Sequence, residues 1–333
     1  MAKNLRIIII SVSLFLIVQT AFLGCGTKKK DFHLGVIQWT ERIEAYKKTY
    51  KGILDGLFDR GYKEGINLRI EYQNIEQDRD LAFKTARELV DKKVDLIIAL
   101  GTGSSLAALK ATEEKKIPIV YSVVGDPKAT GVLGKDENSR KNITGVSMKI
   151  PAKDQLAMVR DVLPHLHRLG ILYCRETPQA ISMAAEAAGS AKEYGWTPFS
   201  VSLGKEDLPL IEEKGSFLAQ EVEAIFVPTD PILVLPDNMK LLIQTADKHR
   251  LPVIAPTEDS IEYGALMATH CDFYEIGRQA AKCIVDVLRG LNVEAIPPAD
   301  PAIKKFSLNL KKARALGIEV KKNVIMKADD LIE

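Results

Sequence analysis

The chain has 333 residues, of which 46% are apolar and 27% are charged. This composition supports a sizeable buried core and excludes an intrinsically disordered protein, and the length suits two domains of ordinary size. The formal net charge of +2 gives no reason to expect nucleic acid as a partner.

The N-terminus has the pattern of an export signal. Lys3 and Arg6 precede an apolar run over residues 7–18, which is too short to span a bilayer comfortably. The following Ala21-Phe-Leu-Gly-Cys25 resembles the lipobox of bacterial lipoproteins, although Phe22 stands where Leu is usual. We expect residues 1–24 to be removed and the thiol of Cys25 to carry lipid, with residues 25–31 as a tether to the membrane of the cell envelope. The alternative is an ordinary signal peptide with an incidental Cys.

Strand and helix patterns alternate from residue 34 onward. Apolar or alternating runs predict strands over residues 34–37, 68–72, 96–100 and 118–122. Apolar residues at helical spacing predict intervening helices over residues 43–58, 81–90 and 106–112. Continuous apolar strands separated by helices indicate a parallel sheet that is covered on both faces.

The same alternation begins again near Arg168. It predicts strands over residues 169–173, 199–203, 224–227, 252–255 and 265–269. It predicts helices over residues 180–194, 208–219, 233–249 and 275–289. We therefore expect an α/β protein of two Rossmann-like lobes with parallel sheets. Lobe 1 would comprise residues 32–148 and about 273–294, and lobe 2 residues 149–272 and about 295–333.

Ligands of parallel sheets bind at the carboxyl ends of the strands, where helix N-termini offer unpaired backbone N–H groups. The candidate site residues therefore follow predicted strands, and they are Trp39, Thr102, Gly103, Ser122, Asp126, Thr229, Asp230, Thr257 and Glu258. The ring of Trp39 could stack on a ligand or pack under the first helix. Asp126, Asp230 and Glu258 could accept hydrogen bonds from a ligand ammonium group or cap helices.

Nucleotide binding and catalysis find little support. Residues 101–105 follow a strand and open a helix, but Leu106 occupies the third glycine position of a dinucleotide loop and no P-loop lysine follows. That turn suits a carboxylate or another small polar acceptor, or simple N-capping without a ligand. The sequence has no nucleophile elbow, and the Cys residues have neither zinc nor redox spacing. We expect no enzyme activity, no cofactor and no metal.

Several short motifs, in order, resemble a known family. They are Leu100-Gly-Thr102, Val124-Gly-Asp-Pro127, Asn142-Ile-Thr-Gly-Val-Ser147, Val227-Pro-Thr-Asp230, Glu262-Tyr-Gly-Ala265 and Asp272-Phe-Tyr-Glu-Ile-Gly277. From about residue 33 to 318 the chain resembles the ABC transporter substrate-binding proteins of the tryptophan/tyrosine type. The resemblance implies a type I periplasmic-binding-protein clamshell that closes on one small ligand and serves a permease with its ATPase. We expect the protein to be a monomer.

The resemblance also implies roles for individual residues. Thr102 and Gly103 would hold one polar end of the ligand, Ser122 and Asp126 would flank it, and Asp230 would reach it from the second lobe. Aromatic amino acids are the ligands usually associated with the family.

The chain departs from the family pattern at two places. Pro231 stands where the family often has Asn, and residues 175–179 replace a Glu-x-Asn-Ser turn. Both changes remove side chains that could hold the head group of an amino acid, so the ligand is left open. A lipid-anchored sensor that presents its bound state to a receptor is the alternative function.

Overall fold

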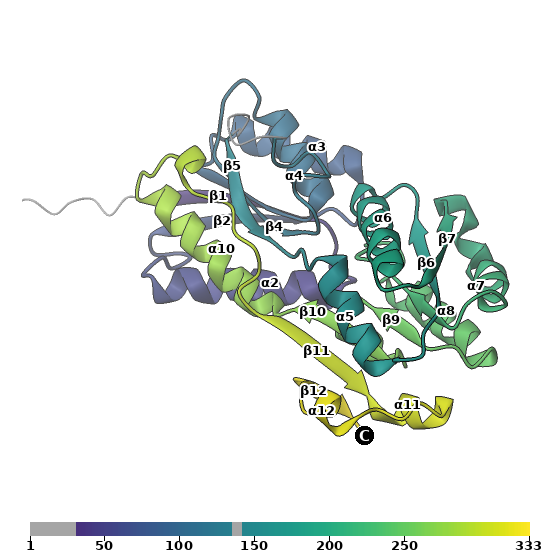
Figure 1. The fold of residues 1–333 in the computed structure, drawn as a ribbon. Coiled ribbons are helices and arrows are strands. Elements are labelled where there is room, and N and C mark those ends of the chain that lie inside the picture. The colour runs from purple at the N-terminus through teal and green to yellow at the C-terminus, as the bar shows by residue number, and fades with distance from the viewer. Residues whose placement is uncertain (1–30, 135–141) are drawn as a thin grey trace, which may run out of the picture.

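The computed structural model describes residues 31–134 and 142–333 (Figure 1). The predicted signal peptide, Cys25 and most of the predicted tether lie outside the described residues. The described chain forms two sheets whose strands are parallel except for one antiparallel pair, each with helices on both faces, as the predicted fold class requires.

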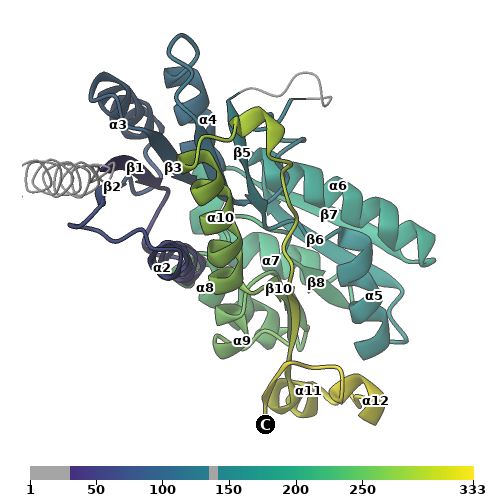
Figure 2. The same ribbon diagram turned by 90° about the vertical axis from the view of Figure 1, so that its left-hand side faces the viewer.

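The first sheet has five parallel strands in the order β2-β1-β3-β4-β5. These strands are β1 (Phe32–Gln38), β2 (Leu68–Asn74), β3 (Leu96–Leu100), β4 (Ile119–Val124) and β5 (Ile143–Ser147). On one face lie α2 (Glu44–Asp59) and α10 (Phe273–Leu288), and on the other lie α3 (Arg79–Asp91) and α4 (Thr102–Ala111) (Figure 2). The strands β3 and β4 are buried along their whole length, which accounts for their continuous apolar sequences.

The second sheet has seven strands in the order β12-β11-β10-β9-β8-β6-β7. They are β6 (Arg168–Cys174), β7 (Thr197–Leu203), β8 (Ala224–Phe226), β9 (Val253–Ala255), β10 (Met267–Cys271), β11 (Lys304–Asn309) and β12 (Asp330–Ile332). All neighbours are parallel except β10 and β11.

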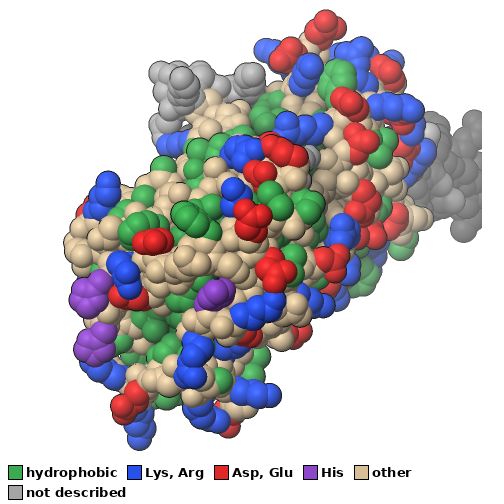
Figure 3. Space-filling view, turned by 90° about the vertical axis from the view of Figure 1, so that its right-hand side faces the viewer, with side chains coloured by type: hydrophobic (Ala, Val, Ile, Leu, Met, Phe, Trp, Pro, Cys, Tyr) green, Lys and Arg blue, Asp and Glu red, His purple; other side chains and the backbone are tan. Residues whose placement is uncertain are grey.

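Two pairs of helices pack beside the second sheet, each pair with its own apolar cluster. They are α5 (Ala152–Val162) with α6 (Pro178–Glu193), and α7 (Ile211–Ala219) with α8 (Pro236–Lys248). Short helical segments complete the chain, namely η2 (Lys205–Leu210), α9 (Asp259–Glu262), η3 (Val293–Ala295), α11 (Leu310–Leu316) and α12 (Lys322–Ile325). Acidic and basic side chains are interspersed over the face of this half that Figure 3 shows, so no field of one sign dominates that face.

Most predicted elements are confirmed, but the apolar patterns missed β5, α5, β11 and β12. The strand β5 reads Ile-Thr-Gly-Val-Ser and is buried throughout, although Gly and two hydroxyl residues interrupt its apolar pattern. The reversed direction of β11 was also not predicted. Direction depends on how the chain returns from the first sheet, and local periodicity carries no information about that.

The chain passes between the sheets after β5, after β10 and before β11. Before the last passage, the Ala299 N–H donates to the Gly145 carbonyl and the Ser147 N–H donates to the Ala299 carbonyl, both at 2.9 Å. The segment that ends at Ala299 therefore lies beside β5 of the first sheet. The predicted division into two lobes stays a prediction.

The helices α2 and α10 approach each other at backbone distance. A Cβ atom added to Gly277 would lie 2.1 Å from the Thr49 carbonyl oxygen, and one added to Gly52 would lie 2.1 Å from the Tyr274 carbonyl oxygen. No side chain fits at either position without separating the helices. This contact holds α10 on the first sheet directly after the chain leaves β10 of the second.

We expect Gly277→Ala to lower the free energy of unfolding by about 1–3 kcal/mol, because the added methyl group overpacks a rigid backbone contact. Gly189 is the matched control, since a Cβ atom there, on α6, meets nothing within 4 Å. Gly189→Ala should raise the free energy of unfolding by about 0.5–1 kcal/mol through helix propensity. Urea denaturation followed by circular dichroism measures both, and shifts in the same direction would contradict the prediction.

Candidate functional site

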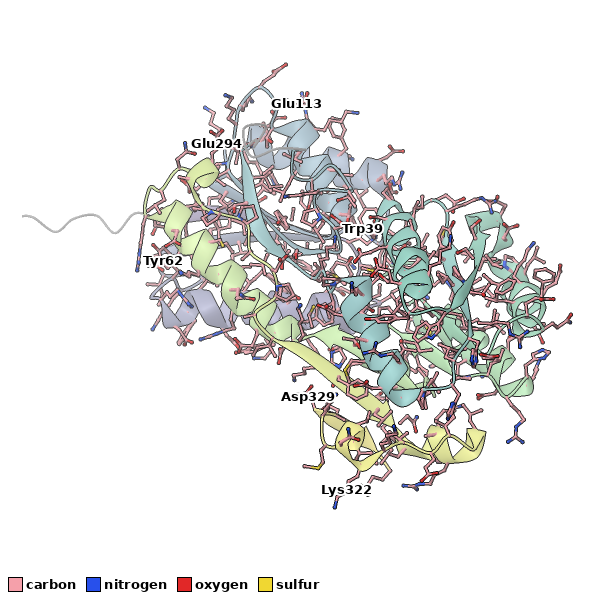
Figure 4. All side chains as sticks on the ribbon, viewed as in Figure 1. Trp39, Tyr62, Glu113, Glu294, Lys322 and Asp329 are labelled. Atoms are coloured by element: carbon pink, nitrogen blue, oxygen red, sulfur yellow. The ribbon has the colours of Figure 1, made fainter. Side chains whose placement is uncertain are left out.

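A cavity of about 360 Å³ lies where the two halves of the molecule meet. Figure 4 shows Trp39 at this junction. The first half contributes residues from the end of β1, from α2, from α3 and from α4, which include Trp39, Tyr46, Arg79, Asp80, Phe83, Thr102, Gly103, Leu106 and Lys110. The second half contributes the start of α6 and the loop after β8, through Thr177, Pro178, Gln179 and Pro231.

The indole of Trp39 forms one wall of this cavity and lies against the first turn of α4. A Cβ atom at Gly103 would be 2.0 Å from Cζ3 of Trp39, so only glycine allows this arrangement of the ring. Trp39 is 9% exposed. Its backbone N–H donates to the Leu100 carbonyl at 3.0 Å and its own carbonyl accepts from the Gln77 N–H at 2.7 Å, which holds the residue at the end of β1.

Two helix N-termini from opposite halves border the same cavity. Thr102 and Gly103 begin α4, and Pro178 begins α6 after Thr177. Because the first N–H groups of a helix have no intrahelical partner and carry its positive end, this arrangement favours a negatively charged or hydrogen-bond-accepting group.

A smaller cavity of about 30 Å³ adjoins the first, since Tyr46, Gln179 and Pro231 line both. The predicted residues Thr229, Asp230 and Thr257 line this smaller cavity. The hydroxyl of Thr257 lies 2.7 Å from that of Ser260.

Buried polar atoms without partners gather at the carboxyl edge of the first sheet. Within the described residues, Gln38 Oε1, Ser104 Oγ and the hydroxyl of the predicted residue Ser122 have no hydrogen-bond partner. Gln38 ends β1, Ser104 lies in the first turn of α4 after β3, and Ser122 lies near the end of β4, and these three strands are adjacent. Buried polar groups are normally paired, so a polar ligand or an ordered water at this edge would supply the missing partners.

The carboxylate of Asp126 is engaged away from the Trp39 cavity. It accepts from the N–H groups of Lys128 and Ala129 at 3.1 and 3.0 Å, and Lys149 lies 2.7 Å from it. Asp126 lines a different cavity of about 530 Å³, beside Lys149 and Asp300. The structure therefore does not bring Asp126 together with Trp39.

Asp230 is fully buried and holds the loop after β8. Its oxygens accept from the backbone N–H groups of Cys174 at 2.6 Å, Ile232 at 2.9 Å and Leu233 at 3.3 Å. Burial raises the pKa of Asp230 to about 6, although these hydrogen bonds act in the opposite direction. The contacts fit the capping role that the sequence left open beside ligand binding.

Glu258 forms one of two ion pairs that join the two halves beside the cleft. Its carboxylate lies 2.6 Å from the ammonium of Lys48 on α2. Arg42, just before α2, lies 3.0 Å from Asp237 at the start of α8. Each pair joins a residue near α2 to one beside the second sheet, so both favour the closed approach of the two halves.

The strand-end rule missed Tyr46, Arg79, Phe83, Leu106 and Lys110, which line the cavity from helices. A helical face that turns towards a partner lobe has the same pattern of polar and apolar residues as a face exposed to solvent.

Within the described residues, no group of three or more His, Cys, Asp or Glu side chains could hold a metal ion. None of the described helices is long and apolar enough to cross a membrane.

Two α/β lobes with a cavity between their strand ends have the architecture of type I periplasmic binding proteins, and the chain shares that fold with a leucine-binding protein from Thermotoga maritima (TM-score 0.60). Residues 33–332 match the family model of the ABC transporter substrate binding proteins, so the chain belongs to that family. It is a solute-binding protein of an ABC transporter and not an enzyme, and it works outside the cytoplasm.

The chain is similar to proteins that bind aromatic amino acids. It is 28% identical over 291 residues to a tyrosine-binding protein of Clostridioides difficile (strain R20291). The aligned residues cover 87% of this chain and 82% of that protein. The structure of an ABC domain from Streptococcus pneumonia in complex with L-Trp has a TM-score of 0.83 at 25% identity, over 91% of this chain and 100% of that one.

A ligand-free, open substrate-binding protein with adhesive properties from Clostridium difficile has a TM-score of 0.73 at 25% identity, over 90% of this chain and 99% of that one. At equal identity, the present structure is thus more similar to the ligand-bound relative than to the open one.

The raised pKa of Asp230 predicts a pH-dependent stability. Its pKa of about 6 in the folded protein exceeds the ordinary value of 3.8. The stability that protonation contributes is therefore complete below about pH 4 and is lost as the pH rises through about 6. The free energy of unfolding of the wild type, relative to Asp230→Asn, should fall by a few kcal/mol between these pH values.

Asp126→Asn provides the opposite control. Although burial raises the pKa of Asp126, hydrogen bonds from Ala129 and Lys149 outweigh it and lower that pKa below 3.8. The advantage of the wild type over Asp126→Asn should therefore be lost as the pH falls below about 4. Urea denaturation across this pH range measures both variants. An unchanged difference for Asp230→Asn between pH 4 and 6 would show that Asp230 does not titrate there.

Proposed function

We propose that this protein is the monomeric, lipid-anchored component that captures a small organic molecule for an ABC importer. Lipid on Cys25 would hold it at the membrane, and the closed, loaded form would be presented to the permease and its ATPase. The observation that carries this proposal is the cavity of about 360 Å³, because residues from both lobes form its walls. Family membership supports the transport role.

Capture follows from the placement of the cavity walls. A single small molecule can contact the start of α4 and the start of α6 together only while the cleft is shut. Because the ligand binds the closed form, it increases the fraction of protein molecules in which the lobes are closed. The ion pairs Lys48–Glu258 and Arg42–Asp237 are largely exposed, and such pairs contribute only about 0–1 kcal/mol each. The ligand therefore decides the closed state.

Among the predicted site residues, we propose Trp39, Thr102 and Gly103 as direct ligand contacts, because they line the cavity. Thr229, Asp230 and Thr257 form the adjoining wall, and Ser122 offers a buried hydroxyl without a partner. We assign Glu258 to the ion pair with Lys48 across the cleft, and Asp126 to the ion pair with Lys149. The aromatic walls suit a ligand with an aromatic part, as the relatives that bind tyrosine and L-Trp suggest.

Mass spectrometry of small molecules released from the denatured, purified protein should identify the ligand. Titration of that ligand should then lower the radius of gyration in small-angle scattering. It should also change the fluorescence of Trp39 more than that of Trp196, which packs on Tyr194 with ring centroids 5.4 Å apart, away from the cleft. The variants Trp39→Phe and Trp196→Phe separate the two signals. A full response in Trp39→Phe with unchanged scattering would contradict both closure and the role of Trp39.

Cys25→Ser should move the protein from the membrane fraction to the soluble fraction. A lipidated N-terminal Cys with more than one acyl chain gives stable attachment, and serine cannot form the thioether that begins this modification. Cell fractionation followed by immunoblotting measures the distribution, with Cys283→Ser as a control because Cys283 is buried in α10. Retention of the Cys25→Ser protein on the membrane would show that another feature anchors it.

A further inference from the structure

We propose that the ligand of this cleft is a small organic acid with an aromatic or otherwise apolar body and no ammonium group. This inference rests on the proposed function and names the class of molecule that the same cavity selects. It is drawn from the charges that line the cavity and from the partners that the nearby carboxylates already have.

The cavity carries two cations without acidic partners. Arg79 projects from α3 and Lys110 from α4, and both line the cavity. Arg79 donates to the Glu176 carbonyl across the cleft at 3.5 Å, and the Lys110 ammonium lies 4.8 Å from the centroid of the Phe83 ring. Within the described residues, neither cation forms an ion pair with a carboxylate. A ligand carboxylate would supply the missing negative charge.

The backbone at two helix N-termini also favours a negatively charged ligand group. The N-termini of α4 and α6 border the cavity from opposite lobes and present the positive ends of helices of 10 and 16 residues. The start of α4 offers N–H groups to a ligand carboxylate, whereas α6 begins with Pro178, which has no N–H, and the Ala180 N–H already donates to the Thr177 carbonyl. The contribution of α6 is therefore chiefly its dipole, and a carboxylate between the two helices would favour closure. Arg79 and Lys110 add to this potential, and Asp80 is the single carboxylate on the described lining.

Carboxylates that could hold an ammonium group are already occupied. Three backbone N–H groups bond to Asp230, Lys48 pairs with Glu258, and Lys149 pairs with Asp126. Pro231, which lines the cavity beside Asp230, has no polar side-chain atom. Asp80 is exposed to solvent, as are Arg79 and Lys110, so all three charges are screened to a similar degree. The two cations still outnumber the one carboxylate on the described lining.

The remaining walls are apolar. Trp39, Tyr46, Phe83 and Leu106 enclose the space beside the cationic rim. Their rings and methyl groups can bury a flat hydrocarbon or indole body, while the carboxylate stays near the helix N-termini. The cavity therefore matches a molecule with one apolar end and one anionic end.

Isothermal titration calorimetry at pH 7, on protein stripped of ligand by unfolding and refolding, tests this with matched pairs. The probes are L-phenylalanine with 3-phenylpropanoate, L-tyrosine with 3-(4-hydroxyphenyl)propanoate, and L-tryptophan with indole-3-propanoate. In at least one pair, the acid that lacks the amino group should bind tenfold more tightly or better, and its affinity should fall as ionic strength rises.

Single variants locate the effect. Arg79→Gln and Lys110→Gln should each weaken binding of the preferred acid about three- to tenfold, and the double variant should weaken it tenfold or more. Arg87→Gln, an equal change of charge at an exposed residue on α3 outside the cavity, should leave the affinity unchanged. Asp80→Asn should leave binding of the acid unchanged or strengthen it.

Each contrary result has a distinct meaning. Equal or tighter binding of the amino acids, above all if Asp80→Asn weakens it, overturns this inference and leaves the proposed function in place. Acid binding that survives the double variant overturns it as well. If none of the probes binds but a different molecule is released and closes the lobes, the proposed function again stands alone. If nothing is released and nothing closes the lobes, the proposed function fails.

Discussion

The arrangement of the whole molecule depends on the close contact between α2 and α10. At Gly52 and Gly277 the two helix backbones touch, so α10 is held on the first sheet directly after the chain leaves the second. This contact, together with the pairing of Ala299 with β5, determines where the crossovers lie. Because the crossovers lie side by side, the carboxyl ends of both sheets face a common cleft.

Within that cleft, apolar and polar side chains have different roles. The ring of Trp39 fills the space above Gly103, which leaves the first N–H groups of α4 at the edge of the cavity. The carboxylates at the strand ends, in contrast, serve the protein itself. Asp230 holds a loop, and Asp126 and Glu258 hold lysines. Charge that is left for a ligand is therefore positive, which is the physical basis of the selectivity we infer.

The ion pairs around α2 show why closure must await a ligand. Lys48 and Glu258 are 39% and 44% exposed, and Arg42 and Asp237 are more exposed still. Water and salt screen such pairs, so they guide the lobes together without holding them. A ligand that contacts both helix N-termini adds interactions in a drier space, where they are stronger. Release to a transporter then requires only that these few contacts be broken.

The sequence by itself determined the elements whose patterns are local. Continuous apolar runs predicted β3 and β4, and the positions after the strands predicted Trp39, Thr102 and Gly103 at the cavity. Only the tertiary structure decided which remaining residues meet there. The helix residues Arg79 and Lys110 and the reversed strand β11 carry no local signal of their position. Their roles depend on contacts between segments far apart in the chain, and periodicity along the sequence does not record those contacts.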